Sequence, residues 1–445
     1  MAWNTLKQRK SLRNFFGHSI KHIAMRSLFK KELWTRELVA WYLYDFANSF
    51  VYINTTLYFS QWIVVDQGLT DFWYSLPFII ATVILILVSS AVGHFGDRTG
   101  RHFGVFFGAS ALAALSVLGM FVAGRFFPEG VRAITALVFF GLYQLGYLLA
   151  FVPYNAFIKY ITSPEQYGAV SGIGFGWGQF GSIAGLFLTL PLVNGSFSLL
   201  GTDRLAPLLL AATAFAVFAL PSMLVFRAKH IAPVAGTAPS PAWWKTFWTH
   251  LLESRKYTGI FPFLLSFYFF SDAILTISLY SAIYLEKVFQ IADSAKVIIF
   301  LLVLVGWGVG SLLAGPLADR LGHRRTLMFS LFWSGVFILA VALVSNERLL
   351  YPIFVLWGFA SGAVYVTSRS YLASLVPKEE SGKFFGLYTF AERFASVIGP
   401  LVWGVTIILF AGIAPVNYRI AAGIMGVIAL LGIIPLRHRA KAAIQ

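Results

Sequence analysis

The chain has 445 residues, of which 58% are hydrophobic and only 12% charged, and its formal net charge is +16. Soluble domains carry roughly 25% charged residues, so this composition excludes a water-soluble globular protein. The chain has no cysteine, which excludes disulfide bonds, thiolate metal sites and dithiol redox motifs. The excess of Lys and Arg is typical of the positive-inside bias of membrane proteins, so we expect no nucleic-acid partner.

Residues 1–35 form a basic segment in which apolar side chains recur at helical spacing: Leu12, Phe15, Phe16, Ile20 and Ile23. This pattern predicts an amphipathic helix that lies in the membrane interface on the cytoplasmic side. The segment lacks the continuous apolar core of a signal peptide. An organelle transit peptide is the alternative interpretation of an Arg-rich, acid-poor start.

Twelve apolar runs follow, each long enough to cross a hydrocarbon core of about 30 Å. We place them at 37–65, 72–95, 103–124, 131–158, 167–193, 206–227, 258–285, 294–317, 326–345, 350–374, 384–411 and 417–436. An even number puts both termini on one side, and the basic segments at both ends predict that this side is the cytoplasm. The sequence therefore predicts an all-α polytopic membrane protein.

The stretch 228–257 divides these spans into two groups of six. It contains three prolines and then tryptophans interleaved with basic residues, a pattern that predicts an interfacial helix rather than a soluble domain. We expect a six-helix bundle over 36–227, a cytoplasmic linker over 228–257, a second six-helix bundle over 258–436 and a basic cytoplasmic tail over 437–445.

A polar hairpin occurs once in each half. The first copy contains Gly93, Asp97, Arg98, Gly100 and Arg101, and the second contains Gly315, Asp319, Arg320, Gly322 and Arg324. The two copies lie almost half of the chain length apart, which indicates an internal repeat and two pseudo-symmetric halves. Glycines permit a tight turn, and an acid at a helix end can pair with basic residues across a moving interface. We interpret both hairpins as cytoplasmic gates.

The first helix of each half carries an acid within the membrane. Asp45 and Asp272 are separated by nearly the same offset as the hairpins. Because a charge at the bilayer centre costs at least about 2.5–3.5 kcal/mol on insertion scales, such residues are candidates for a function. We consider both as protonation or cation-coupling positions. The alternative is that each acid is paired structurally and only holds helices together.

Three further charges fall in the last spans: Arg369, Glu392 and Arg393. The spans that carry Arg369 and Glu392 run in opposite directions, which places the two residues at similar depth. Facing a central cavity, these groups can carry a proton at Glu392 or hold the two ends of a zwitterion. A fixed Arg369–Glu392 ion pair is the alternative.

Other polar residues of the spans are candidates for substrate binding: Asn48, Tyr154, Asn155 and Gln179. Gln179 belongs to Gly176-Trp-Gly-Gln-Phe-Gly181, which matches a dinucleotide-binding pattern, but no strand precedes it and the motif lies inside a span. The small residues Gly168, Gly172 and Gly176, with Gly174 and Gly178, instead indicate close helix packing. All eight histidines fall outside the spans, and we expect neither a metal nor another cofactor. Without a P-loop, a zinc-protease motif or a serine elbow, we expect no enzyme.

The first hairpin resembles the motif of the major facilitator superfamily, and the likeness extends over residues 36–436. Within that superfamily the chain resembles the vacuole-effluxer branch and its bacterial relatives, on Trp41-Tyr-Leu-Tyr-Asp-Phe-Ala-Asn-Ser49, Tyr154-Asn-Ala-Phe157, Ser368-Arg-Ser370, Phe384-Phe-Gly-Leu-Tyr388 and Ile398-Gly-Pro400. Fungal members of that branch are associated with amino-acid export from the vacuole. The chain departs from the branch at Glu392-Arg393, where Gly-Lys is common.

The resemblance and the charges together predict a secondary transporter that works by alternating access. We expect it to export a small zwitterion such as an amino acid, with proton coupling, as a monomer in the bacterial inner membrane, in contact with lipids. A non-transporting membrane receptor or scaffold on the same fold is the alternative, and a membrane enzyme comes third.

Overall fold

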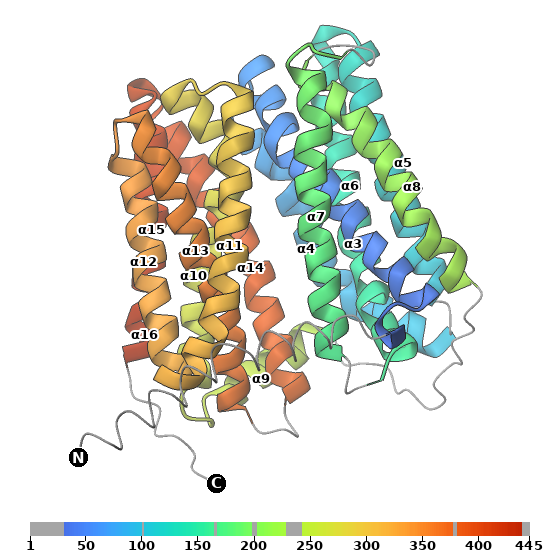
Figure 1. The fold of residues 1–445 in the computed structure, drawn as a ribbon, viewed down its shortest axis with the longest axis vertical. Coiled ribbons are helices and arrows are strands. Elements are labelled where there is room, and N and C mark those ends of the chain that lie inside the picture. Colours follow the sequence, from blue (N-terminus) through green and yellow to red (C-terminus); the bar gives the residue numbers. More distant parts are fainter. Residues whose placement is uncertain are drawn as a thin grey trace, which may run out of the picture.

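The computed structural model describes residues 31–99, 102–163, 167–197, 203–227, 243–376 and 381–437. Throughout these ranges the secondary structure is helical, with no strand. Two groups of long helices stand side by side, the first from blue to green and the second from yellow to red (Figure 1). The predicted helical membrane protein in two bundles is therefore confirmed.

The N-terminal half contains six long helical segments. They are α3 (Arg36–Asn54) with its continuations η3 (Thr55–Phe59) and η4 (Trp62–Asp66), α4 (Asp71–Thr99), α5 (His102–Phe126), α6 (Glu129–Ile161), α7 (Tyr167–Val193) and α8 (Ala206–Arg227). Helix α3 packs mainly against α7 and α8, and α5 packs against α6.

The C-terminal half repeats this plan. Its segments are α10 (Ile260–Phe289), α11 (Asp293–Leu321), α12 (His323–Leu343), α13 (Glu347–Leu375), α14 (Ser381–Leu409) and α15 (Val416–Leu431) with the short α16 (Ile433–Arg437). Helix α10 packs against α14 and α15, and α11 packs against α13. The first helix of each half thus packs against the fifth and sixth, as α3 does against α7 and α8, and the second packs against the fourth, as α4 does against α6. These equivalent contacts indicate internal pseudo-symmetry.

Eleven of the described helices are long and apolar enough to cross a membrane. The twelfth predicted span is the segment from α3 to η4. It is not among the eleven because its polar residues lower its mean hydropathy. Its last turns are π-helical, and Ser60 and Gln61 there donate hydrogen bonds to the carbonyls of Thr56 and Leu57 at 2.6 and 2.5 Å. Polar side chains that bond to their own helix lower the cost of placing this segment among apolar helices.

Glycines of α7 bring its backbone against α3. A Cβ atom at Gly181 would lie 2.3 Å from the carbonyl oxygen of Phe46, and one at Gly185 would lie 2.8 Å from the Cγ2 atom of Ile53. The predicted close packing is thus observed at Gly174 and Gly178, and Gly181 and Gly185 extend it, whereas the surroundings of Gly168 and Gly172 lie outside the described residues. Gly176, which we also expected in the contact, has no neighbouring atom within 4 Å of such a Cβ.

The variant Gly181→Ala is expected to lower the free energy of unfolding by about 1–3 kcal/mol, because the new methyl group meets backbone that cannot move aside. Thermal unfolding in detergent measures this loss. Gly176→Ala, on the same helix and without a neighbour, serves as the matched control and should unfold like the parent protein. Equal stability of the two variants would contradict the proposed contact between α7 and α3.

The two polar hairpins differ from the predicted loops. Helix α4 continues to Thr99, so Gly93 and Asp97 belong to its last turns rather than to a loop, and α11 continues to Leu321. Between α11 and α12 only Gly322 remains, with a φ of 93° that other residues rarely adopt. Gly100 and Arg101 lie outside the described residues, as do the side chains of Asp97, Arg98 and Asp319.

The linker contains the predicted helix, α9 (Trp243–Ser254), which contacts α14 and α10 at the lower end of the molecule in Figure 1. The side chains of Trp248 and Leu252 are more than half exposed. The predicted helix within residues 1–30 and the tail beyond Arg437 lie outside the described residues. We name this end of the molecule the linker end. The opposite end, which holds the α3–α4, α7–α8 and α10–α11 connections, is named the Arg204 end.

Candidate transport site

A cavity of about 330 Å³ lies between the two halves. The N-terminal half lines it with Ser49, Tyr52, Ile53, Thr56, Tyr147, Phe175, Gln179 and Ser182. The C-terminal half lines it with Ile274, Leu275, Ser278, Ser281, Ile299, Phe300, Val303, Leu304, Trp307, Phe354, Trp357 and Tyr365. Among these residues none is acidic or basic, and aromatic rings and hydroxyl groups predominate. The cavity suits a solute with an apolar or flat part.

Two polar atoms of this lining lack a hydrogen-bond partner within the described ranges. They are the Oε1 atom of Gln179, on α7, and the Nε1 atom of Trp357, on α13, and both are buried. A buried polar group without a partner is costly, typically by about 1–3 kcal/mol. A solute that accepts from Trp357 and donates to Gln179 would remove that cost on both halves at once. Gln179 is the predicted substrate-binding residue that lines the cavity.

At the Arg204 end, a cluster of charges joins the two halves. The guanidinium of Arg204, just before α8, forms ion pairs with three carboxylates: Asp66 at 2.8 Å, Asp293 at 3.0 Å and Glu286 at 3.2 Å. The ammonium of Lys296 is fully buried, pairs with Asp293 at 2.9 Å and also contacts Glu286 and the amide oxygen of Gln61. Since Arg204, Asp66 and Gln61 belong to one half and the others to the second, these pairs hold the Arg204 end closed.

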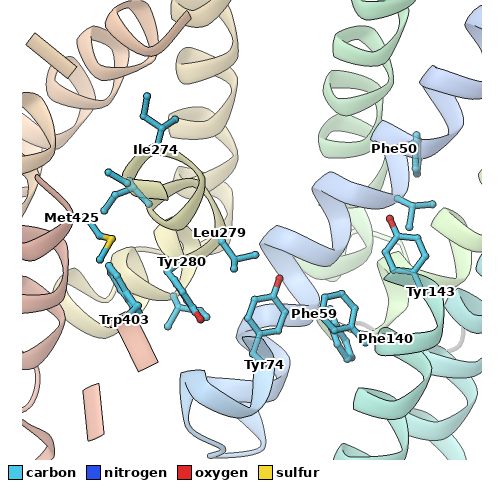
Figure 2. Close-up of a cluster of buried hydrophobic side chains, with 14 of the residues drawn as sticks. Phe50, Phe59, Tyr74, Phe140, Tyr143, Ile274, Leu279, Tyr280, Trp403 and Met425 are labelled. Atoms are coloured by element: carbon cyan, nitrogen blue, oxygen red, sulfur yellow. The ribbon is translucent and has the colours of Figure 1, made fainter. Parts of the chain in front are cut away.

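A second cross-half contact lies beside this cluster. Asp71, the first residue of α4, accepts hydrogen bonds from Nε1 of Trp403 on α14 and from the hydroxyl of Tyr418 on α15, both at 2.8 Å. Next to it, Tyr74 and Tyr280 meet edge to face with ring centroids 6.4 Å apart, and Trp403 stacks on Tyr280 (Figure 2). The polar and aromatic contacts that we describe between the halves therefore gather at one end.

Asp45 lies where α3, α6 and α7 meet. Its carboxylate is within hydrogen-bond reach of the Tyr154 hydroxyl, which donates to the carbonyl of Trp41 at 3.0 Å. The Trp41 and Tyr154 rings stack with centroids 4.6 Å apart. A Cβ atom at Gly174 would lie 2.9 Å from Oδ2 of Asp45. No basic residue pairs with this carboxylate in the described part of the chain. An ion pair that would only hold helices together is therefore not observed at Asp45.

Asp272 repeats this arrangement in the second half. Its side chain is 2% exposed, it accepts a backbone hydrogen bond from Gly399, and its Oδ1 atom lacks a partner within the described ranges. A Cβ atom at Gly399 would lie 2.7 Å from Oδ1 of Asp272. In each half, a carboxylate of the first helix thus lies beside a glycine of the fifth helix. The glycine is Gly174 of α7 in the first half and Gly399 of α14 in the second.

The three other membrane charges, Arg369, Glu392 and Arg393, are not part of the cavity lining. Arg369 is exposed and hydrogen-bonds to Tyr388, and it forms no ion pair with Glu392 among the described contacts. The fixed Arg369–Glu392 pair is therefore not present in this conformation. Tyr147 and Tyr365, which line the cavity, lie within electrostatic range of Glu392, and Tyr147 is also in range of Arg393.

Besides Arg369 and Arg393, three predicted substrate-binding residues lie outside the cavity lining. Asn48 is buried and donates to the carbonyl of Tyr44 in its own helix at 2.9 Å. Tyr154 is buried against Trp41, and Asn155 is exposed one residue later. In the second hairpin, Arg324 donates to the carbonyls of Leu436 and Arg437 within its own half. Their predicted roles as ligands or gate residues stay predictions.

The sequence analysis missed the cluster at the Arg204 end. None of its acids was singled out, although Lys296 stands one turn inside a span, three positions after Asp293. A lysine at that depth needs an acidic partner, since an unpaired charge there is costly. That spacing was the available signal. The cross-half partner, Arg204, gave no comparable signal because a basic residue in a connection between spans is ordinary.

A fold of two six-helix halves around a central cavity, with one end closed by contacts between the halves, is that of transporters of the major facilitator type. A family model described as vacuole effluxer Atg22 like matches residues 162–436, more than half of the chain. The chain therefore belongs to that family.

Relatives and solved structures agree with this assignment. The MFS-type transporter YxiO of Bacillus subtilis (strain 168) is 25% identical over 392 residues, covering 84% of this chain and 88% of YxiO. Autophagy-related protein 22 of Pichia angusta is 24% identical over 176 residues, covering 37% and 31% of the two chains. The crystal structure of the nucleoside transporter NupG aligns with a TM-score of 0.66 at 14% identity over 91% and 98% of the chains. That of an inward-facing bacterial homologue of the lysosomal transporter Spinster aligns with 0.61 at 13% identity over 91% and 94%. The fold and the relatives support transport as the function of this integral membrane protein.

Proposed function

We propose that the protein is a secondary active transporter that carries a small polar solute by alternating access, with proton coupling. The observation that carries this proposal is the cavity between the halves, together with the bonds that close it at the Arg204 end. If these bonds break while the linker end closes, the same cavity faces the other side of the membrane. We place the linker end in the cytoplasm of a bacterial inner membrane, because basic residues gather there.

The solute that fits best is an amino acid or a similar zwitterion. Its apolar part would rest among the aromatic rings of the cavity, and Gln179 and Trp357 would supply hydrogen bonds. Its charged ends would meet Glu392 and Arg393, which act electrostatically on the ring of Tyr147. The proposed direction is export, and the proposed working form is a monomer in direct contact with lipids.

Proton coupling would use the membrane carboxylates. Asp45 and Asp272 lie in equivalent places of the two halves, each under a glycine and neither in an ion pair among the described contacts. A buried carboxyl without a cation is stable in its neutral form and ionises when water reaches it. Glu392, nearer the linker end, is the third candidate for carrying the proton.

The experiment is a measurement of proton movement in proteoliposomes while a panel of amino acids and short peptides is added outside. We expect that transport of one compound is accompanied by proton movement across the membrane. The variant Glu392→Gln should abolish this proton movement. Glu129→Gln is the matched control, because Glu129 is exposed at the Arg204 end and far from the cavity. It should leave the signal unchanged.

Silence across the panel, with folded protein confirmed, would overturn proton-coupled amino-acid transport. Movement of a labelled amino acid without protons would contradict the coupling and retain the transport. Saturable binding without movement would contradict transport and favour a receptor on the same fold.

A further inference from the structure

A further carboxyl, that of Asp71, lies buried in the contact between the halves. Asp71 is 0% exposed, and the structure gives both of its oxygens a partner from the other half. Oδ2 accepts from Nε1 of Trp403, and Oδ1 is bonded to the hydroxyl of Tyr418. Both partners are neutral. The carboxyls of the neighbouring cluster, by contrast, bind Arg204 or Lys296 directly.

The groups that face Asp71 leave it without a direct counter-ion. Helix α14 presents Trp403, α15 presents Tyr418, and α10 presents Tyr280 together with Lys287, whose charge acts on Asp71 without an ion pair among the described contacts. The amino end of α4 adds a partial positive charge, which favours the anion. Full burial acts in the opposite direction, since a carboxylate away from water and without a cation is destabilised.

Both contacts of the Asp71 carboxyl can persist when it is protonated. A tyrosine hydroxyl can accept a hydrogen bond as well as donate one, whereas an indole N–H only donates. In the acid form, Oδ1 carries the proton and donates to Tyr418, and Oδ2 still accepts from Trp403. In the anionic form, both neighbours donate. The same two contacts therefore serve both states, and in the acid form the hydroxyl hydrogen of Tyr418 turns away from Asp71.

Opening of the Arg204 end changes the surroundings of Asp71 completely. The carboxyl belongs to α4 in one half, and both of its partners belong to α14 and α15 in the other. Any separation of the halves at this end removes both bonds at once and replaces them with water. A carboxyl in water ionises well below neutral pH.

We propose that Asp71 is a proton-binding site that senses the state of the Arg204 end, holding a proton while this end is closed and releasing it to water when it opens. On opening, the O–H bond of the carboxyl breaks, the electron pair stays on the carboxylate and the proton passes to water on that side. The inference rests on the alternating access proposed above, and it adds a coupling site outside the central cavity.

Closing this end requires Asp71 to take up a proton, so acid on the Arg204 side favours closure and alkaline solution favours opening. The chain has no native cysteine, so single-cysteine variants report on individual positions. Ser75, one turn after Asp71, is fully buried at the same contact, and Ser196 is exposed at the same end.

The experiment compares the rates at which a thiol reagent modifies Ser75→Cys and Ser196→Cys in purified protein between pH 5 and 8. The exposed cysteine corrects for the pH dependence of the thiol itself. We expect the ratio of the two rates to rise about tenfold or more over this range. While the closed carboxyl keeps its proton and the open one has lost it, each pH unit adds up to tenfold in favour of the open form. A ratio that does not change with pH would overturn the proposal, and this test keeps the native Asp71.

Two further variants test whether Asp71 causes the pH dependence of the labelling ratio. Asp71→Asn keeps both hydrogen bonds and cannot ionise, so it should give a low, pH-independent ratio. Asp203→Asn changes an acid of the same end whose ion pair, with Arg125, lies within one half, and it should retain the rise. A rise that survives in Asp71→Asn, or one that vanishes in Asp203→Asn, would overturn the assignment. The labelling needs no substrate, so its failure leaves the transport proposal intact.

Discussion

Replacing Arg204 by Gln is expected to open the Arg204 end of the protein. The substitution leaves Asp293 and Glu286 with Lys296 as their remaining direct cation, and it leaves Asp66 without one among the described contacts. Removing one partner of a largely buried ion pair typically costs about 3–5 kcal/mol. Here that cost falls only on the closed arrangement, because water solvates the acids once the halves separate. The closed-to-open ratio should therefore drop by a factor of about one hundred or more, since 1.4 kcal/mol corresponds to tenfold.

The rate of labelling at Ser75→Cys measures this opening, and a large increase over the parent background is the expected result. Arg125→Gln provides the control. Its ion pair with Asp203, at 2.8 Å, is exposed to water and lies within the N-terminal half, and exposed pairs contribute only about 0–1 kcal/mol. If both variants raise labelling equally, the cluster around Arg204 does not hold the halves together.

The variant Gly399→Ala is expected to lose transport almost completely and to lower the free energy of unfolding by about 3 kcal/mol. The new Cβ would lie 1.9 Å from Oγ1 of Thr276 and 2.7 Å from Oδ1 of Asp272. Neither atom can move far, because both belong to the buried face of α10. Flux in proteoliposomes and thermal unfolding in detergent measure the two effects separately.

Two further variants separate crowding of the carboxyl from a general packing defect. Gly386→Ala lies on the same helix with no atom within 4 Å of its Cβ, and it should behave like the parent protein. Adding Thr276→Ala to Gly399→Ala removes the nearest atom but leaves the crowding of Asp272. Stability should then recover in part while transport stays low. Full recovery of transport in the double variant would show that Asp272 needs no free space there.

The architecture could be predicted because lipid imposes a simple rule. Each span must be a long apolar helix, so the spans placed from composition agree with the helices to within a few residues. The polar run after Asn54 did not disturb this prediction, since Ser60 and Gln61 bond to their own helix. The hairpin repeat indicated two similar halves, and the equivalent positions of Asp45 and Asp272 follow the same repeat.

The site was predicted only in part, for a physical reason. Periodicity in one sequence tells which residues lie on one helix face, but it does not tell which faces of the two halves meet. Gln179 lines the cavity as expected, whereas Asn48 turns into its own helix. The partners of Asp71, Trp403 and Tyr418, are more than 300 positions away. Contacts at that separation depend on how the halves dock, which no local pattern encodes.

The measurement that tests alternating access most directly is a pair of distance distributions between spin labels, one across each end of the molecule. Labels at Ser196→Cys and Ala292→Cys span the Arg204 end, and labels at Ser163→Cys and Ser374→Cys span the linker end, all at positions that are at least partly exposed. We predict that Arg204→Gln lengthens the first distance and shortens the second in the same sample. A longer first distance with an unchanged second would contradict alternating access, because the two ends would then move independently.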